Sequence, residues 1–493
     1  MTTHTDTGPI TAPPTLDTAR ANPRRVESRD PATGLVWRDY EAASATDVTR
    51  TVAAARRAQL AWGATPVRER ARVLEHFRRA LFARRREVAE LICRENGKPP
   101  SEAMGTEVML VLDFARFYRD RAPRLLRDRS LTPFNAAFWR KRVHITHEPF
   151  GVVGIISPWN YPFMLASAQV LAALVSGNAV VLKPSEFTPA TGLMIGDLMR
   201  DAGLPDGVLH IVTGNGSAGA ALVSSEIDKL FFTGSNATGL KVSRACAERM
   251  IPCVLELGGS DPAIVLEDAD IAHAVSGIAW GRFSNAGQTC VAPKRVFVVG
   301  EAHDAFVAKL AEVVKALKMG AGSAPGTDVG PMIRPQQRAV LEAQLEDALA
   351  HGAYIAARTP VGGADGDGFF APAILTDVTN DMRVMREETF GPLLPVVRVR
   401  DADEAVQMAN ATPYGLSASV WGRDVRRARA VAARLASGSV TINDSIVQAG
   451  IAEAPHGGIK QSGTGRSHGE AGLLECVQTK TLIVDLLPGR REP

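Results

Sequence analysis

The segment Ser284–Cys290 (SNAGQTC) holds one thiol at the end of a short run of polar and small residues. A structural cysteine would be expected among Val, Ile and Leu, whereas this thiol follows residues whose backbone N–H groups could reach a substrate oxygen. A thiol attacks as its thiolate, a form that a polar, partly exposed setting favours. Cys290 is therefore a candidate nucleophile. A cysteine taken alone is more often structural, so this interpretation depends on the rest of the chain.

The cysteines as a group indicate neither a metal site nor disulfide bonds. They are odd in number, lie far apart and form no CxxC pair. The sequence therefore predicts no zinc site and no disulfide framework, and it favours a reducing cytoplasm. The five are Cys93, Cys246, Cys253, Cys290 and Cys476.

Two polar residues follow apolar runs that read as buried strands. Asn160 lies in PWNYP, just after residues 151–157, and ligands of open α/β sheets bind beyond the carboxyl ends of the strands. Its side-chain NH₂ could hold a developing oxyanion, or the residue could form an Asx turn. Glu256 lies in LELGG. Desolvation would raise the pKa of its carboxyl group and suit it as a general base, but a buried structural acid is an equal alternative.

Three further segments offer contacts to a dinucleotide. In KPSE, Glu186 could accept the hydroxyl groups of an adenosine ribose, with Lys183 beside it, and it would repel a 2′-phosphate, which favours NAD; an early-helix acid explains it equally well. In FTGSNATG the glycines have the spacing GxxxxG rather than GxGxxG, yet a glycine turn before a helix can bind pyrophosphate. In EETFGP, Glu388 and Phe390 could contact the nicotinamide ribose or form an ordinary surface turn.

The elements that would position these residues read as alternating strands and helices. Helical spacing covers residues 46–96 and 103–118, and Pro133 breaks the pattern. From residue 151 onward, continuous apolar strands alternate with helices, which predicts parallel sheets covered on both faces. A second unit resumes with a strand at 295–299 and a helix at 302–319. Residues 140–147 alternate as a strand with one wet face that could pair with another subunit. The expected strands of the first parallel sheet are 151–157, 179–182, 208–212, 229–232, 253–257 and 263–266.

The bulk properties fit a protein of two or three domains. A chain of 493 residues is too long for one core, since single cores stop growing at roughly 250–300 residues. The net charge of +3 does not indicate a nucleic-acid partner or an anionic membrane. No stretch approaches the roughly 18 apolar residues of a membrane span. We expect residues 1–25 to form a disordered tail without a signal peptide.

Taken together, the motifs resemble those of the aldehyde dehydrogenase superfamily. The match runs from about Arg25 to Val484, and seven motifs occur in the family's order: PWNYP, KPSE, FTGS, ELGG, GQTC, EETFGP and PHGGIKQSGTGR. The resemblance implies NAD(P)-dependent oxidation of an aldehyde to the acid through a Cys290 thiohemiacetal and thioester. It gives Asn160 and the Cys290 N–H the role of oxyanion hole. It gives Glu256 that of the base that activates water, an acid generally lacking in branches that use coenzyme A.

The resemblance also implies the remaining assignments. The fold would be α/β, with two doubly wound parallel-sheet domains and a small β oligomerisation segment in a homodimer or homotetramer. Residues 26–127 and 150–258 would bind the dinucleotide, 259–463 would form the catalytic domain, and 128–149 and 474–493 the oligomerisation segment. NAD is the expected cofactor, with NADP possible, held by Trp159, Lys183, Ser185, Glu186, Gly234, Ser235, Glu388 and Phe390.

The identity of the aldehyde stays open at this point. By analogy the substrate pocket is mostly apolar and suits aliphatic or aromatic aldehydes. Succinate-semialdehyde enzymes of the family often carry an arginine where this chain has Ser284, although Arg282 is near in sequence. A non-catalytic scaffold of the same fold is the alternative from another class. The pocket residues would be Phe114, Phe117, Tyr161, Met164, Val291 and Ile446.

Overall fold

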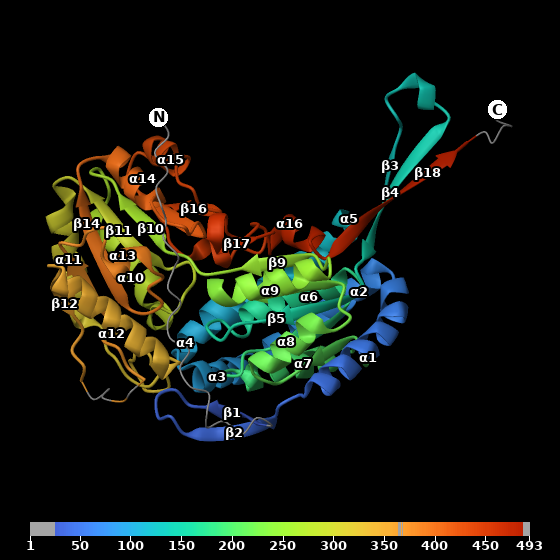
Figure 1. Cartoon of the computed structure of the whole chain (residues 1–493), viewed down its shortest axis with the longest axis horizontal. Helices are drawn as coiled ribbons and strands as arrows, with labels where there is room; N and C mark the ends of the chain where they lie inside the picture. Colours follow the sequence, from blue (N-terminus) through green and yellow to red (C-terminus); the bar gives the residue numbers. More distant parts are fainter. Residues whose placement is uncertain (1–24, 363–365, 367, 487–493) are drawn as a thin grey trace.

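The computed structural model describes residues 25–362, 366 and 368–486. Two α/β lobes lie side by side, and a narrow three-stranded arm projects from one of them (Figure 1). One lobe is built on a six-stranded sheet and the other on a seven-stranded sheet. The predicted pair of parallel-sheet units is confirmed. The tail predicted for residues 1–25 lies outside the described residues, except for Arg25, which begins a strand.

The first sheet has the strand order β17-β9-β8-β5-β6-β7, and only β17 runs antiparallel to its neighbour. Along β5 (Val152–Ile156), Val152 and Val153 belong to two different apolar cores on opposite faces. Because both faces are covered, every position of the strand is apolar. The other strands are β6 (Ala179–Lys183), β7 (Leu209–Ile211), β8 (Lys229–Thr233), β9 (Cys253–Glu256) and β17 (Gly463–Thr464).

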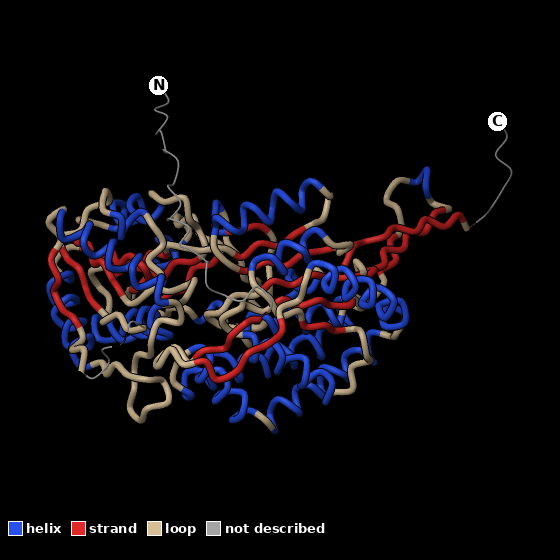
Figure 2. Tube along the Cα trace, turned by 60° about the horizontal axis from the view of Figure 1, so that its bottom comes forward, coloured by secondary structure: helices blue, strands red, loops and turns tan. Residues whose placement is uncertain are grey.

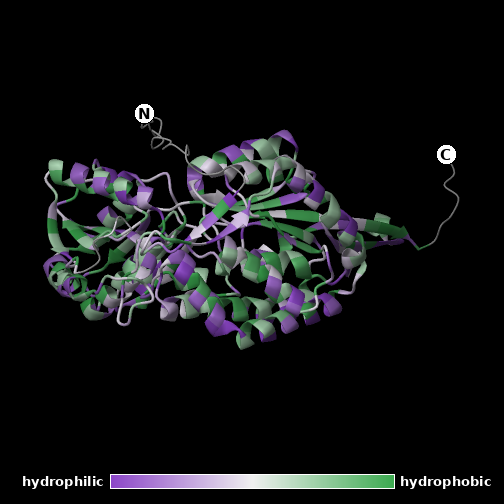
Figure 3. Ribbon diagram, turned by 90° about the horizontal axis from the view of Figure 1, so that it is seen from below, coloured by the Kyte–Doolittle hydropathy of each residue, from purple (hydrophilic) through white to green (hydrophobic). Residues whose placement is uncertain are grey.

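Helices cover both faces of this sheet. The apolar faces of α1, α8 and α9 fill the core on one side, and those of α2, α3, α5, α6 and α7 fill the core on the other. Figure 3 shows the mainly hydrophobic strands between helices that mix hydrophobic and hydrophilic residues. The helices are α1 (Ala45–Ala64), α2 (Val67–Ala83), α3 (Arg85–Asn96), α4 (Pro100–Ala103), α5 (Met109–Leu125), α6 (Met164–Val175), α7 (Pro189–Asp201), α8 (Gly216–Ser224) and α9 (Asn236–Glu248).

The predicted helical stretches differ from these helices in their ends. The stretch 46–96 is three helices, and the stretch 103–118 begins with a π-helical turn over Met104–Val108 and runs to Leu125, eight residues before Pro133. A hairpin of β1 (Arg25–Arg29) and β2 (Val36–Glu41), which the sequence did not reveal, precedes α1.

The second sheet has the order β12-β13-β14-β11-β10-β15-β16, and only β12 is antiparallel. The predicted strand at 263–266 lies here as β10, so its placement in the first sheet was wrong: the chain leaves the first sheet at Gly258 and Gly259. The predicted helix 302–319 ends at Ala316. The strands are β10 (Asp261–Val265), β11 (Pro293–Val299), β12 (Tyr354–Arg358), β13 (Ala373–Thr376), β14 (Leu393–Val399), β15 (Ser417–Trp421) and β16 (Ser439–Ile442); the helices are α10 (Ile271–Phe283), α11 (Ala302–Ala316), α12 (Pro335–Ala350), α13 (Arg383–Arg386), α14 (Ala402–Asn410) and α15 (Val425–Ala432).

The arm is an antiparallel sheet of the order β18-β4-β3 that extends beyond the helices (Figure 2). Its strands are β3 (Arg129–Leu131), β4 (Lys141–Pro149) and β18 (Val477–Asp485), and α16 (Gly469–Leu474) precedes β18. The strand predicted at 140–147 is present. The single wet face predicted for this strand is absent, because every residue of β4 is half-buried. Most of its partner strand β18 is exposed. Residues 487–493 of the expected oligomerisation segment lie outside the described residues.

Within the described ranges, no helix combines the length and the apolar character that crossing a membrane requires. Over the same ranges, no group of three or more His, Cys, Asp or Glu side chains is arranged to hold a metal ion.

Candidate active site

The loop that carries Cys290 is shaped by an unusual backbone. Asn285 and Ala286 take left-handed conformations, with φ of 51° and 53°. At Gly287, where φ is 72°, a Cβ atom would lie 2.4 Å from the backbone carbon of Gly391, so only glycine fits. Arg282, fully buried, donates to the carbonyl oxygens of Thr389 and Gly391. The loop is thereby fixed against the segment that precedes β14.

Asn160 is tied directly to this loop. Its Nδ2 donates to the carbonyl oxygen of Gln288 at 3.0 Å, and the Nδ2 of Asn285 donates to the carbonyl oxygen of Asn160 at 2.8 Å. One N–H of the Asn160 amide is thus used, and the second remains for a ligand. Among the described residues, no hydrogen bond uses the backbone N–H of Cys290. Two free donors therefore lie on the nucleophile's side of the loop.

A buried polar network supports the turn at Asn160, and the sequence did not reveal it. The Nζ of Lys98 donates to the carbonyl oxygen of Asn160 at 2.9 Å and to Oε1 of Glu107 at 2.7 Å. Asn96 donates to the carbonyl oxygen of Trp159 at 2.9 Å. Both side chains of the Lys98–Glu107 pair are fully buried. The available signal was an acid in the apolar stretch around Glu107, where a charge is costly unless it is paired.

Glu256 ends β9 and is 4% exposed. Its Oε1 accepts a hydrogen bond from Ser467 Oγ. The segment 455–466, whose many glycines by themselves indicate mobility, packs here, with Gly463 paired to Glu256 in β17. A Cβ atom on Gly463 would lie 2.0 Å from the carbonyl oxygen of Leu255, so that glycine allows two backbones to approach closely.

The surroundings of Cys290 differ from the expected thiolate-favouring setting. Burial raises the pKa of the Cys290 thiol to about 12; Lys294 opposes the rise, and the acids Glu256, Asp261 and Glu388 add to it. The thiol is therefore protonated at neutral pH in this structure. The expected partial exposure is present, since Cys290 is half-buried, but desolvation of the sulfur and the acids gathered around it disfavour the thiolate.

Alkylation should reveal this difference between cysteines. A hydrogen bond from Cys246 and the charge of Lys229 lower the pKa of Cys253 to about 7. Without coenzyme, we expect iodoacetamide to label Cys253 at a rate that levels off above about pH 8, whereas labelling of Cys290 should rise about tenfold per pH unit through about pH 10. Peptide mass spectrometry over time measures both rates. A plateau for Cys290 near neutral pH would contradict the raised pKa.

Lys294 and Glu388 lie beneath the nucleophile. The Nζ of Lys294 donates to the carbonyl oxygens of Thr289 at 3.0 Å and Cys290 at 2.5 Å. Glu388 accepts from the N–H of Gly259 at 3.0 Å. A Cβ atom on Gly258 would lie 2.1 Å from Oε2 of Glu388. Glu388 is therefore no surface turn residue but lies next to the loop of Cys290, and Lys294 is a neighbour that the sequence did not suggest.

Most of the predicted cofactor residues lie at the carboxyl ends of the neighbouring parallel strands β5, β6 and β8, whereas Glu388 and Phe390 precede β14 in the second lobe. Ser235 caps the thirteen-residue helix α9 by accepting from the N–H of Thr238 at 3.4 Å, and Ser235 is exposed. The Nζ of Lys183 lies 3.3 Å from Glu186, whose side chain is 38% exposed. An exposed helix N-terminus beside a cation and an accessible carboxylate suits a dinucleotide with two ribose groups. The rings of Trp159 and Phe390 meet edge to face at 5.5 Å, while Ser185 and Gly234 lie in the same two turns.

Two of the predicted pocket residues make contacts that locate them relative to the site. Tyr161 lies beside the nucleophile, since its hydroxyl is 2.8 Å from Thr289 Oγ1. Phe114 is fully buried and packs against His468 with ring centroids 4.4 Å apart, behind Glu256. Of the others, Phe117, Met164 and Val291 are buried, and Ile446 is half-buried.

Comparisons with known proteins agree with the motifs. The model of the aldehyde dehydrogenase family matches residues 18–482. A 4,4'-diapolycopene aldehyde oxidase from Methylomonas sp is 42% identical over 85% of this chain and 78% of that protein. A mitochondrial succinate-semialdehyde dehydrogenase from Arabidopsis thaliana is 36% identical over 93% of this chain and 85% of that protein.

Solved structures match closely as well. An NAD-dependent aldehyde dehydrogenase from Sinorhizobium meliloti superposes with a TM-score of 0.90 at 36% identity, covering 95% of this chain and 92% of that chain. An NADP-dependent enzyme from E. coli has a TM-score of 0.90 at 34% identity, covering 94% and 95%. A non-catalytic scaffold finds no support in these relatives. The chain belongs to the aldehyde dehydrogenase family and is an oxidoreductase that acts on an aldehyde with NAD or NADP.

Proposed function

We propose that the chain converts an apolar aldehyde to the free carboxylic acid, with Cys290 as nucleophile, Asn160 as oxyanion donor and Glu256 as base. The contact that supports this most directly joins Asn160 to the cysteine loop. One N–H of the Asn160 amide bonds the carbonyl of Gln288, two residues before Cys290. The other can meet an oxygen on the carbon that the sulfur attacks.

The Cys290 thiol gives its proton to solvent and its sulfur adds to the carbonyl carbon, while the developing oxyanion is held by Asn160 and the Cys290 N–H. A bound nicotinamide would supply the hydride acceptor. Loss of the hydride leaves a thioester on Cys290, which splits a difficult oxidation into two easier steps. Glu256 then takes a proton from a water molecule that attacks the thioester, and the acid leaves as the sulfur is released.

Apolar aldehydes are favoured by the position of Arg282. Its guanidinium is fully buried, and Nη2 donates to the carbonyl oxygens of Thr389 and Gly391, while Nε and Nη1 have no partner among the described residues. We infer that this burial keeps it from a substrate's distal carboxylate. A carboxylate without a partner in an apolar pocket is costly. The relative at 42% identity is named for a 4,4'-diapolycopene aldehyde. The alternative, succinate semialdehyde, is favoured by the name of the Arabidopsis relative.

A matched pair of aldehydes tests the substrate class. 4-Methylpentanal has nearly the shape of succinate semialdehyde, with two methyl groups in place of the carboxylate oxygens. We expect kcat/KM to be at least about tenfold higher for 4-methylpentanal, since the pocket would leave a carboxylate unpaired. Steady-state reduction of coenzyme measures both. A preference for succinate semialdehyde would instead establish the alternative.

We also expect NAD to be used better than NADP, because the accessible carboxylate of Glu186 would repel a 2′-phosphate. The same assays run with each coenzyme compare the two values of kcat/KM.

The arm is the proposed contact between copies of the chain, in a homodimer or homotetramer within the cytoplasm. It carries apolar side chains that no other part of the described chain covers, and a monomer rarely exposes so many together. Sedimentation of the full chain measures the subunit number. The exposed apolar residues of the arm include Leu131, Phe134, Phe138, Trp139, Leu482 and Ile483.

A further inference from the structure

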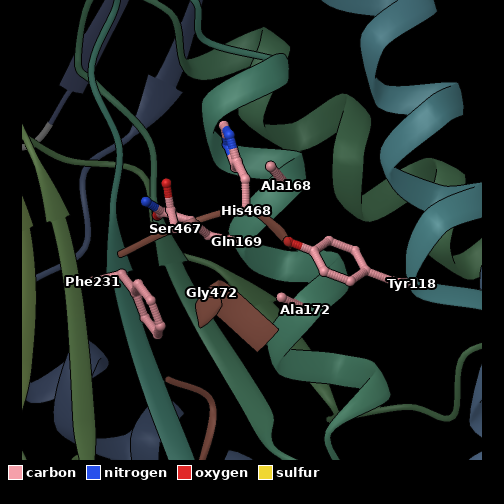
Figure 4. Close-up of a pocket in the computed structure, with 8 residues that line it drawn as sticks. All are labelled: Tyr118, Ala168, Gln169, Ala172, Phe231, Ser467, His468 and Gly472. Carbon is pink, nitrogen blue, oxygen red and sulfur yellow. The ribbon is translucent and has the colours of Figure 1, made fainter. Parts of the chain in front are cut away.

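A small cavity lies beside Ser467 (Figure 4), whose hydroxyl donates to Glu256. It leaves about 10 Å³ for the centre of a water molecule, which is close to the room that one ordered water needs. Four of its lining residues are polar: Tyr118, Gln169, Ser467 and His468. All four are at most 4% exposed.

Three of the residues that line the cavity each have a polar atom without a partner in the described protein. The Nε2 of Gln169 donates to Thr233 Oγ1 at 3.3 Å, whereas its Oε1 accepts no hydrogen bond, and His468 Nδ1 has no partner either. The hydroxyl of Tyr118 makes no hydrogen bond with any described residue and points toward the cavity in Figure 4. Buried polar atoms of this kind are normally satisfied by an ordered water.

The backbone of Ser467 is held firmly in this position. Its N–H and carbonyl exchange hydrogen bonds with His456, at 2.8 and 2.7 Å. Gly472 of α16 presses on it so closely that a Cβ atom there would lie 2.5 Å from the carbonyl carbon of Ser467. These backbone contacts therefore hold Ser467 where its hydroxyl can reach Glu256.

We propose that Ser467 is a positioning residue for Glu256, and that one water molecule, bridging Tyr118, Gln169 and Ser467 in the cavity, holds the serine hydroxyl in its donating direction. A hydroxyl that accepts from a water can give its own proton to the carboxylate. Together the serine and the water would keep the Glu256 carboxylate oriented toward the water molecule whose proton it takes. This inference rests on the role proposed for Glu256 as base.

Replacing Ser467 with alanine tests the proposal. Without the serine hydroxyl the Glu256 carboxylate loses its orientation toward the hydrolytic water, so kcat should fall by roughly tenfold. The coenzyme-reduction burst that precedes hydrolysis should keep its amplitude, because acylation does not use Glu256. Tyr118→Phe should lower kcat by less, and Ser467→Thr, which keeps the hydroxyl, should restore it. Ser176→Ala is the matched control, since Ser176 is buried and its hydroxyl has no partner.

An unchanged kcat in both Ser467→Ala and Tyr118→Phe would overturn the proposal, as would a high-resolution crystal structure with no water between Tyr118 and Gln169. If Ser467→Ala does not fold, Tyr118→Phe and the crystal structure still decide. Failure of the base itself is distinguishable: full turnover by Glu256→Gln would refute the proposed function, whereas a stalled Glu256→Gln with a normal Ser467→Ala would refute only this inference.

Discussion

Replacing Cys290 with alanine is expected to abolish oxidation of every aldehyde. Without the sulfur no thiohemiacetal forms, and a loss on the order of 10⁴-fold or more in kcat/KM follows from removing a nucleophile. Coenzyme binding should persist, because the proposed contacts to the adenosine ribose and pyrophosphate, Lys183, Glu186 and Ser235, follow β6 and β8 in the first lobe. Steady-state coenzyme reduction measures the activity, and quenching of protein fluorescence by NADH measures the binding.

Cys253→Ala is the matched control for this loss. Cys253 is half-buried, as Cys290 is, and its pKa of about 7 makes it the more reactive thiol toward alkylating agents. It should nonetheless keep nearly full activity. Loss of activity in Cys253→Ala with activity retained in Cys290→Ala would assign the nucleophilic attack to Cys253 and refute the proposed mechanism.

Replacing Glu256 with glutamine is expected to separate the two halves of the reaction. Glutamine keeps the shape of the side chain but cannot take a proton from water, so hydrolysis should slow by about 10²- to 10⁴-fold. Acylation should continue. Stopped-flow absorbance should therefore show a burst of about one NADH per active site, followed by almost no turnover.

Glu267→Gln provides the corresponding control. Glu267 is an exposed acid that pairs with Arg427 at 2.6 Å, far from the chemistry, and a surface pair of this kind contributes little to stability. Its variant should have normal burst and steady-state rates. A normal steady-state rate for Glu256→Gln would mean that another group activates the water.

The contrast between Asn160 and Lys98 shows how far the site could be predicted from the chain alone. Asn160 was predictable because it follows a continuous apolar strand, and the carboxyl ends of parallel strands lie along one edge of the sheet. Lys98 was not predictable, because tertiary packing alone brings its Nζ to Glu107 and to the carbonyl oxygen of Asn160. Nothing in the local sequence distinguishes it from a solvated lysine.

Ser467 and Glu256 show the same limit in another form. The register of β17 against β9 brings together two residues that are 211 positions apart. The glycines between 455 and 466 indicated mobility by composition, yet they serve close contact between backbones. A glycine can adopt conformations that other residues rarely adopt, but the neighbouring segment decides whether that glycine is mobile or lets two backbones pack closely.

By itself the sequence determined the α/β class, the two parallel-sheet units, the residues able to attack, donate and take up protons, and the family that uses them. These follow from local alternation and from motif spacing, which act over short stretches of chain. The tertiary structure alone decided the direction of the pKa shift of the Cys290 thiol, the burial of Arg282, and the cavity beside Ser467. Desolvation and through-space charge depend on which distant segments meet, and no local pattern encodes that.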